Sequence, residues 1–229
     1  MSNCPEVLNE FYTKSETFGA SFKKRAERYL SIISFLRIKN PDFLNRVNPT
    51  IIQGGFFKSS VCVFREFCAE IAPNSRIFHL DVRKDAFPDV SGESNFIKAD
   101  LRELPFRGES VDILFMDLVL DYISNQGLRE IAAEARRVLT GEGIVLGSLL
   151  PLKHFLTPPA FPFYPRDYND LCRIMSGFIP VFLEKNNPHH SDIFAFAKSG
   201  SKFPKSEVKR RSNKRIFSHY DLYVSTVND

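Results

Sequence analysis

The spacing of apolar residues changes along the chain, and each change predicts a different kind of element. From Ala26 to Leu36 apolar side chains recur near helical spacing, which predicts an N-terminal helix. Pro41 ends this run, because proline cannot continue the hydrogen-bond ladder of a helix. We therefore expect residues 1–49 to form a helical cap on whatever follows.

After residue 49, short apolar runs typical of strands alternate with helical segments. Seven such runs occur: TIIQ, RIFHLDV, NFIKAD, VDILFMD, GIVLGSLL, IPVFLEK and SDIFAFA. Before the fifth run lies an amphipathic helix from Leu128 to Leu139, which Gly141 is expected to end. The last two runs flank the turn-like NNPHH and predict an antiparallel pair at one edge. The pattern therefore predicts an α/β, doubly wound sheet of seven strands, mostly parallel, over residues 50–198.

Composition narrows the class of protein without changing this picture. Hydrophobic residues make up 43% and charged residues 25%, as in ordinary globular domains. There is no apolar run long enough to cross a bilayer, and the N-terminus lacks the basic start and apolar region of a signal peptide. The four cysteines are scattered without metal-ligand spacing. We expect a cytoplasmic protein with reduced thiols, no membrane span and no metal site.

Charge is distributed unevenly between the body and the C-terminal end. Residues 198–215 hold eight Lys or Arg and one Glu, a local charge of +7, which leaves −3 for the rest of a chain whose net charge is +4. We expect residues 199–229 to form a basic, partly disordered tail. Such a tail can contact the phosphates of nucleic acid, although a solvated tail is the commoner case.

The central part of the chain carries a recognisable order of motifs. They are SRIFHLDVRKD, then NFIKADLRELPFRGESVDILFMDLVLDYIS, then LREIAAEARRVLTGEGIVLGS. From Thr50 to Ser148 this order resembles a class I S-adenosylmethionine-dependent methyltransferase of the Rossmann-like superfamily. The resemblance implies S-adenosylmethionine as cofactor and, as partner, a small-molecule substrate that accepts its methyl group.

Polar residues that follow the predicted strands are the candidates for cofactor binding. In open α/β sheets, ligands bind outside the carboxyl ends of the strands. The resemblance implies that Asp81 accepts the ribose hydroxyls and that Asp100 holds the adenine amino group, with Leu101 as an apolar wall. It places Asp117 and Leu118 near the methionine part of the cofactor and the target atom.

The loop after the first strand departs from the family pattern. Gly54 and Gly55 allow a sharp turn, but Gln53 stands where the family usually has an acid, and phenylalanines follow where further glycines would be expected. In one interpretation the glycines make the turn and Lys58 helps to neutralise the methionine carboxylate. In the other, Phe56 and Phe57 fill the cofactor site, and the chain is a catalytically silent binding module.

Three residues are candidates for moving a proton during methyl transfer. His154 follows the fifth strand on the ligand side of the sheet, and its side chain titrates near neutral pH. Asp121 and Tyr122 follow the fourth strand and are comparable candidates. Because methyl transfer can rely largely on positioning, the reaction does not depend on any one of them.

Overall fold

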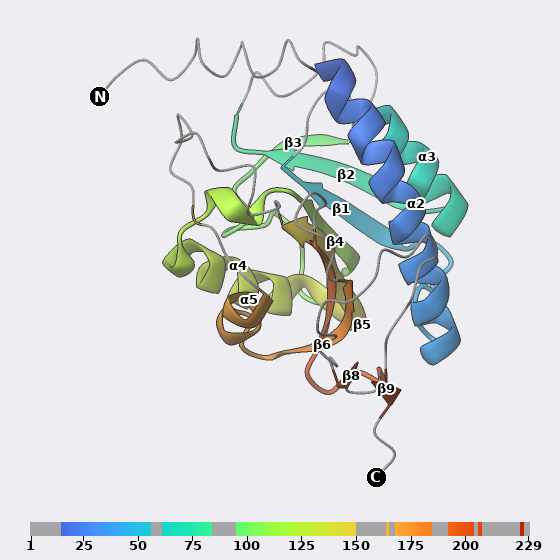
Figure 1. Cartoon of the computed structure of the whole chain (residues 1–229), viewed down its shortest axis with the longest axis vertical. Helices are drawn as coiled ribbons and strands as arrows, with labels where there is room; N and C mark the ends of the chain where they lie inside the picture. The colour runs from blue at the N-terminus through green and yellow to red at the C-terminus, as the bar shows by residue number, and fades with distance from the viewer. Residues whose placement is uncertain are drawn as a thin grey trace, which may run out of the picture.

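A seven-stranded sheet forms the centre of the computed structural model, with strand order β3-β2-β1-β4-β5-β7-β6 (Figure 1). Its strands are β1 (Thr50–Gly54), β2 (Arg76–Asp81), β3 (Phe96–Lys98), β4 (Val111–Asp117), β5 (Leu139–Leu149), β6 (Phe178–Glu184) and β7 (Asp192–Lys198). The structure describes residues 15–55, 61–83, 95–149, 164, 168–184, 192–203, 206–207 and 225–226.

Strand directions confirm the predicted fold class. Strands β1 to β5 pair in parallel, whereas β7 lies between β5 and β6 and is antiparallel to both. From β1 the chain proceeds outward to β2 and β3, and it then returns to place β4 on the other side of β1. The sheet therefore changes its winding direction between β1 and β4, which is where ligands bind in folds of this class.

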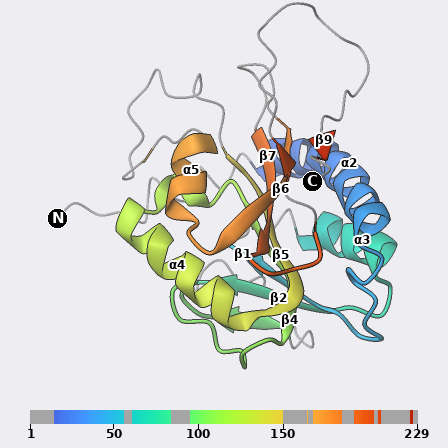
Figure 2. The same cartoon turned by 90° about the horizontal axis from the view of Figure 1, so that it is seen from below.

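Helices cover both faces of the sheet, as Figures 1 and 2 show. One face carries α2 (Ser15–Lys39) and α3 (Val61–Ile71); the other carries α4 (Asn125–Val138) and α5 (Tyr168–Ile174). Each face has its own apolar cluster, because the buried strands direct alternate side chains to opposite faces. Under α2 and α3 the cluster is aromatic: the Phe115 ring lies 4.7 Å from Tyr29 and 4.9 Å from Phe64 between centroids.

Helix α4 ends earlier than the sequence predicts. Ser124 caps its start by accepting a hydrogen bond from the Gly127 amide at 3.1 Å. The helix stops at Val138, and the cap residue Leu139 is already extended and belongs to β5. Gly141 lies inside β5, so its predicted role as helix terminator is wrong. The last helical carbonyls instead accept from the amides of the loop before β4, including Ser110 N to Val138 O at 2.8 Å, which removes the need for a glycine cap.

Both segments outside the sheet have described parts that pack against it. Residues Ala26, Tyr29, Ile32, Ile33 and Leu36 of α2 are buried in the core. At the start of the tail, Phe203 is buried against Phe43 with ring centroids 5.4 Å apart. Further on, β8 (Ser206–Glu207) pairs with β9 (Ser225–Thr226). The division into cap, domain and tail at residues 49 and 198 remains a prediction.

In the described part of the chain, no helix combines enough length with enough apolar character to cross a membrane.

Candidate functional site

The predicted cofactor residues lie where the parallel strands reach their carboxyl ends. This side of the sheet is called the ligand edge below. Gly54 ends β1, Asp81 ends β2 and Asp117 ends β4, while Asp100 comes two residues after β3. Since β1, β2 and β4 are neighbours and all parallel, these ends lie side by side. The four residues therefore share this edge, and their roles in binding a cofactor remain a prediction.

Asp81 is held by an arginine two residues further along the chain. Its Oδ1 accepts from the Arg83 amide and from Arg83 Nε, and its Oδ2 accepts from Arg83 Nη2, each at 2.9 Å. The Asp81 side chain is 6% exposed and that of Arg83 is 26% exposed. The carboxylate predicted to bind ribose is thus paired with a side chain of its own loop.

Asp100 repeats this arrangement one strand further out. Its carboxylate accepts from the Arg102 amide at 2.9 Å, from Nε at 3.0 Å and from Nη2 at 2.6 Å. Hydrogen bonds from Arg102 lower the pKa of Asp100, so the carboxylate is ionised at neutral pH. Both acids therefore belong to an Asp-x-Arg tripeptide with the same fork-shaped pairing.

The two glycines of the loop after β1 receive apolar side chains from neighbouring loops. A Cβ on Gly54 would lie 2.5 Å from Leu101 Cδ2, and one on Gly55 would lie 2.5 Å from Val119 Cγ2. Gly55 also has a φ of +66°, a left-handed backbone that suits glycine. A side chain at either position would therefore displace Leu101 or Val119, which cover the two glycines from the ligand edge.

Gln53, which stands in place of the family's acid, bonds within the sheet. Its Oε1 lies 2.7 Å from Nδ1 of His79, the residue beside it on β2. His79 is fully buried, and burial followed by the charge of Arg65 lowers its pKa to about 4. The imidazole is therefore neutral at physiological pH, and Nδ1 donates to the Gln53 amide oxygen. The side-chain amide of Gln53 thus links β1 to β2.

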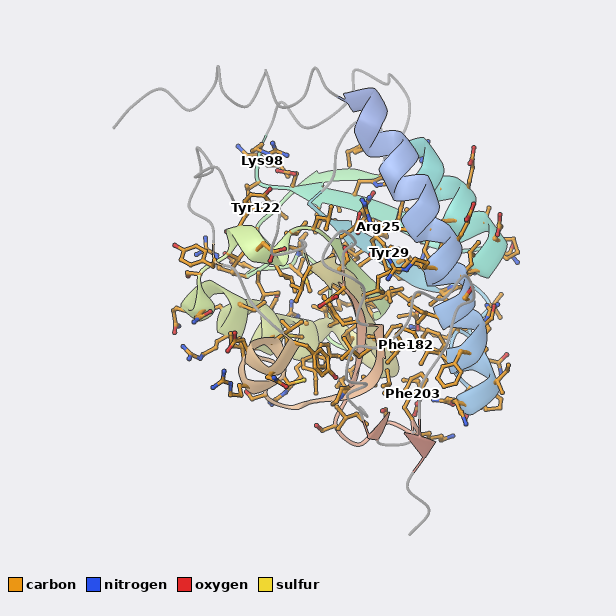
Figure 3. The ribbon with its side chains drawn as sticks, in the orientation of Figure 1. Arg25, Tyr29, Lys98, Tyr122, Phe182 and Phe203 are labelled. Carbon is orange, nitrogen blue, oxygen red and sulfur yellow. The ribbon has the colours of Figure 1, made fainter. Side chains whose placement is uncertain are left out.

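Asp117 is the centre of a buried network that joins α2 to the sheet. Arg25 donates from Nη2 to Oδ2 at 2.8 Å and from Nε to Oδ1 at 3.0 Å, and both side chains are 9% exposed. Oδ1 also accepts from the hydroxyls of Tyr29 at 2.8 Å and Ser148 at 2.6 Å. Burial, and then the charge of Asp117, raises the pKa of Tyr29, which keeps the phenol protonated as a donor. Figure 3 shows Arg25 and Tyr29 directed from α2 toward the sheet.

Leu118, the next residue, has a strained backbone. Its φ is +56°, which is rare for a side chain of this size, and its amide donates to Ser148 O at 3.2 Å. Such strain persists only where surrounding contacts hold it. Here the Asp117 network on one side and the bond to β5 on the other supply those contacts.

Two of the three candidates for proton transfer lie in the short helix η3 (Leu120–Tyr122) that follows β4. Asp121 is 1% exposed, whereas Tyr122 is 40% exposed at the ligand edge (Figure 3). Burial, and then the charge of Asp121, raises the pKa of Tyr122. At neutral pH the phenol of Tyr122 is therefore a hydrogen-bond donor. The third candidate, His154, lies outside the described residues, as do Phe56, Phe57 and Lys58.

Several residues at this edge were not identified from the sequence. Arg83 and Arg102 follow their acids in the tripeptides DVR and DLR, so the repeated Asp-x-Arg pattern is a local signal that indicates both pairs. Arg25 and Asp117 are separated by 92 positions, and no local pattern links them. Among the described residues, no group of three or more His, Cys, Asp or Glu side chains is placed to hold a metal ion.

Comparisons with known proteins agree with this geometry. Residues 62–147 match the family model described as a methyltransferase domain. A solved structure of the PH0226 protein from Pyrococcus horikoshii OT3 superposes with a TM-score of 0.54 at 15% identity, over 75% of this chain and 91% of that one. The chain has the class I methyltransferase fold. The resemblance predicted from the sequence is thus confirmed.

Two further structures with this methyltransferase fold widen the comparison. An S-adenosylmethionine-dependent methyltransferase from Aquifex aeolicus has a TM-score of 0.53 at 15% identity, covering 73% of this chain and 98% of that one. Geranyl diphosphate C-methyltransferase from Streptomyces coelicolor A3(2), solved with Mg²⁺, geranyl diphosphate and S-adenosyl-L-homocysteine, has a TM-score of 0.51 at 11% identity, covering 73% and 80%. No curated protein matches the sequence.

Proposed function

We propose that the protein transfers a methyl group from S-adenosylmethionine to a small molecule. The observation that carries this proposal is the pair of ionisable acids, Asp81 and Asp100, at adjacent strand ends next to Gly54 and Gly55. The parallel register of β2 on β1 and of β3 on β2 brings them together. Two carboxylates so spaced suit a nucleoside, one for the ribose hydroxyls and one for the adenine amino group.

Further features support a zwitterionic cofactor and an organic substrate. Helix α3 begins at Val61, six residues after Gly55, and its N-terminal end favours the carboxylate of a methionine group. At the far end of the site, Tyr122 and Tyr164 are both partly exposed, and the Tyr164 amide donates to Asp121 O at 2.8 Å. Two aromatic rings near the end of β4 suit an apolar or aromatic small molecule.

The chemistry requires little from the protein beyond positioning. A lone pair on the substrate atom attacks the methyl carbon while the carbon–sulfur bond breaks, and its electrons remain on sulfur as the neutral thioether. The substrate atom then loses its proton to a nearby base or to water. Tyr122, which is exposed, and Asp121, which lies buried beside it, remain the described candidates for moving this proton, together with His154.

A second function, a catalytically silent binding module, is favoured by different observations. Leu101 and Val119 already cover the two glycines, and the Gln53 side chain, in place of the family's acid, bonds to His79. A site altered in this way could hold another ligand or a partner protein. The basic tail remains a separate prediction for nucleic-acid contact.

Calorimetry with S-adenosylhomocysteine distinguishes the two functions. The wild-type protein is expected to bind it, and Asp81→Ala is expected to weaken binding at least roughly tenfold, because each charge-assisted hydrogen bond contributes about 1.5–3 kcal/mol. Asp170→Ala, which removes an exposed carboxylate from α5, serves as the matched control and should bind as the wild type does. No heat at millimolar ligand would leave the silent module as the better description.

A further inference from the structure

The two arginines that follow the nucleoside-binding acids compete with the ligand for the same oxygens. A carboxylate oxygen has two lone pairs. Oδ1 of Asp81 already accepts two N–H groups, from the amide and from Nε of Arg83, and Oδ2 accepts a third from Nη2. A ribose that offers a hydroxyl to each oxygen cannot add to this arrangement unless the Nε–H leaves Oδ1.

From this geometry we propose that Arg83 acts as a latch on Asp81. Its guanidinium must leave the Asp81 carboxylate, which opens the latch, before a nucleoside can bind. The inference rests on the proposed function, since it concerns the same ligand. Arg102 forms the equivalent latch on Asp100. Each latch lowers the apparent affinity for the cofactor, because only the open fraction of the protein can bind.

Exposure indicates that these arginines can move, in contrast to Arg25. The Arg83 side chain is 26% exposed and lies in the segment that directly follows β2, so its guanidinium can swing into solvent and remain hydrated. Arg25 makes a similar fork on Asp117, but both partners are 9% exposed and Arg25 projects from the long helix α2. The arginine is therefore held in place at Asp117, whereas at Asp81 the same pairing can be displaced by a ligand.

The two latches differ in strength for the same reason. Side chains of Arg102 and Asp100 are 53% and 35% exposed, so solvent weakens their attraction more than it does at Asp81. In addition, an adenine amino group needs one oxygen of Asp100, whereas a ribose diol uses both oxygens of Asp81. Arg83 is thus the dominant latch.

The test measures S-adenosylhomocysteine affinity by calorimetry in the wild type, Arg83→Ala, Arg102→Ala and Arg83→Lys. Arg83→Ala should bind about three- to tenfold more tightly than the wild type, and Arg102→Ala should gain less. Arg83→Lys should resemble Arg83→Ala, because an ammonium group cannot form the fork that occupies both oxygens. Arg173→Ala removes the same charge from the exposed pair in α5 and should leave affinity unchanged.

Ionic strength gives an independent readout. Salt screens the partly exposed Arg83–Asp81 pair, so raising it from about 50 mM to about 0.5 M should increase wild-type affinity relative to that of Arg83→Ala. The ligand is zwitterionic with no net charge in both titrations, and the difference between the two proteins isolates the latch.

The possible results separate failure of the latch from failure of the proposed function. Wild-type binding with equal or weaker binding by Arg83→Ala would overturn the latch alone. A gain for Arg83→Ala with none for Arg83→Lys would show an effect of charge without the fork and would also overturn it. Absence of binding by all variants, with melting temperatures unchanged, would overturn the proposed function and the latch together.

Discussion

Gly55 shows how a single residue connects the fold to the candidate site. Its amide donates to Leu80 O at 2.8 Å, which keeps the chain beside β2 at the point where it leaves β1. Its φ of +66° turns the chain away from the sheet, and the missing side chain leaves room for Val119 from the loop after β4. One glycine therefore allows the turn, the strand contact and the close approach of a second loop.

Gly55→Ala should destabilise the protein by about 2–3 kcal/mol, as measured by urea unfolding. About 1–2 kcal/mol comes from placing a Cβ in the left-handed region, and the rest comes from displacing Val119, whose Cγ2 would lie 2.5 Å away. Gly200→Ala is the matched control: its φ is +98°, but a Cβ there has nothing within 4 Å, so only the backbone cost of about 1–2 kcal/mol applies. Equal losses in the two variants would show that Val119 adjusts without cost.

Helix α2 depends on the ion pair between Arg25 and Asp117 for its attachment to the ligand edge. Apolar residues such as Ile33 and Leu36 bury the turns that follow Arg25 and Tyr29 in the core. Around the middle of the helix the contact is polar, because Arg25 and Tyr29 both bond to the carboxylate that ends β4. The network therefore sets the position of the helix relative to the strained Leu118.

Arg25→Ala should lower the free energy of unfolding by about 3 kcal/mol, because it leaves the Asp117 carboxylate buried with one charged partner removed. Arg25→Lys should recover only part of this loss, since lysine cannot supply the fork. Glu27→Ala, at an exposed position of the same helix, should change stability by less than about 0.5 kcal/mol. A loss below about 1 kcal/mol for Arg25→Ala would mean that water replaces the guanidinium and that the ion pair does not anchor α2 to β4.

Helices and strands could be predicted from the sequence where a local pattern of apolar residues defines them. Their boundaries were less predictable where contacts with distant parts of the chain determine them. The alternation of apolar runs located all seven strands of the central sheet, and the periodic apolar face of α4 was recognised because burial follows the 3.6-residue repeat. The end of α4 was missed, since the loop before β4 satisfies its carbonyls from a distant part of the chain. In the site, strand ends identified the acids, but the partner of Asp117 comes from 92 positions away and could not be inferred.

At the scale of the whole molecule, two largely apolar clusters enclose the sheet, one on each face. His79 and Gln53 are buried polar side chains within it, and they bond to each other across β1 and β2. The imidazole stacks on Phe96 with centroids 5.0 Å apart and meets the edge of Phe64 at 5.9 Å. A charge at this position would face both an apolar layer and Arg65, so the fold is stable with a neutral imidazole.

The stability of the whole fold should therefore depend on pH through His79. In the unfolded chain histidine titrates near 6.5, whereas in the folded protein the pKa of His79 is about 4. Between these values the unfolded state binds the proton and the folded state does not, so the free energy of unfolding decreases as pH falls from 6.5 to 4, by roughly 3 kcal/mol in total. Above pH 6.5 this histidine contributes no pH dependence.

Urea unfolding of the wild type and of His79→Gln at several pH values measures the effect. Carboxyls with lowered pKa values, such as Asp100 and Glu134, also lose stabilising charge in acid, but they do so equally in both proteins. The difference between the two curves should thus shrink as pH falls through this window, and parallel curves would show that His79 becomes protonated without cost in the folded state.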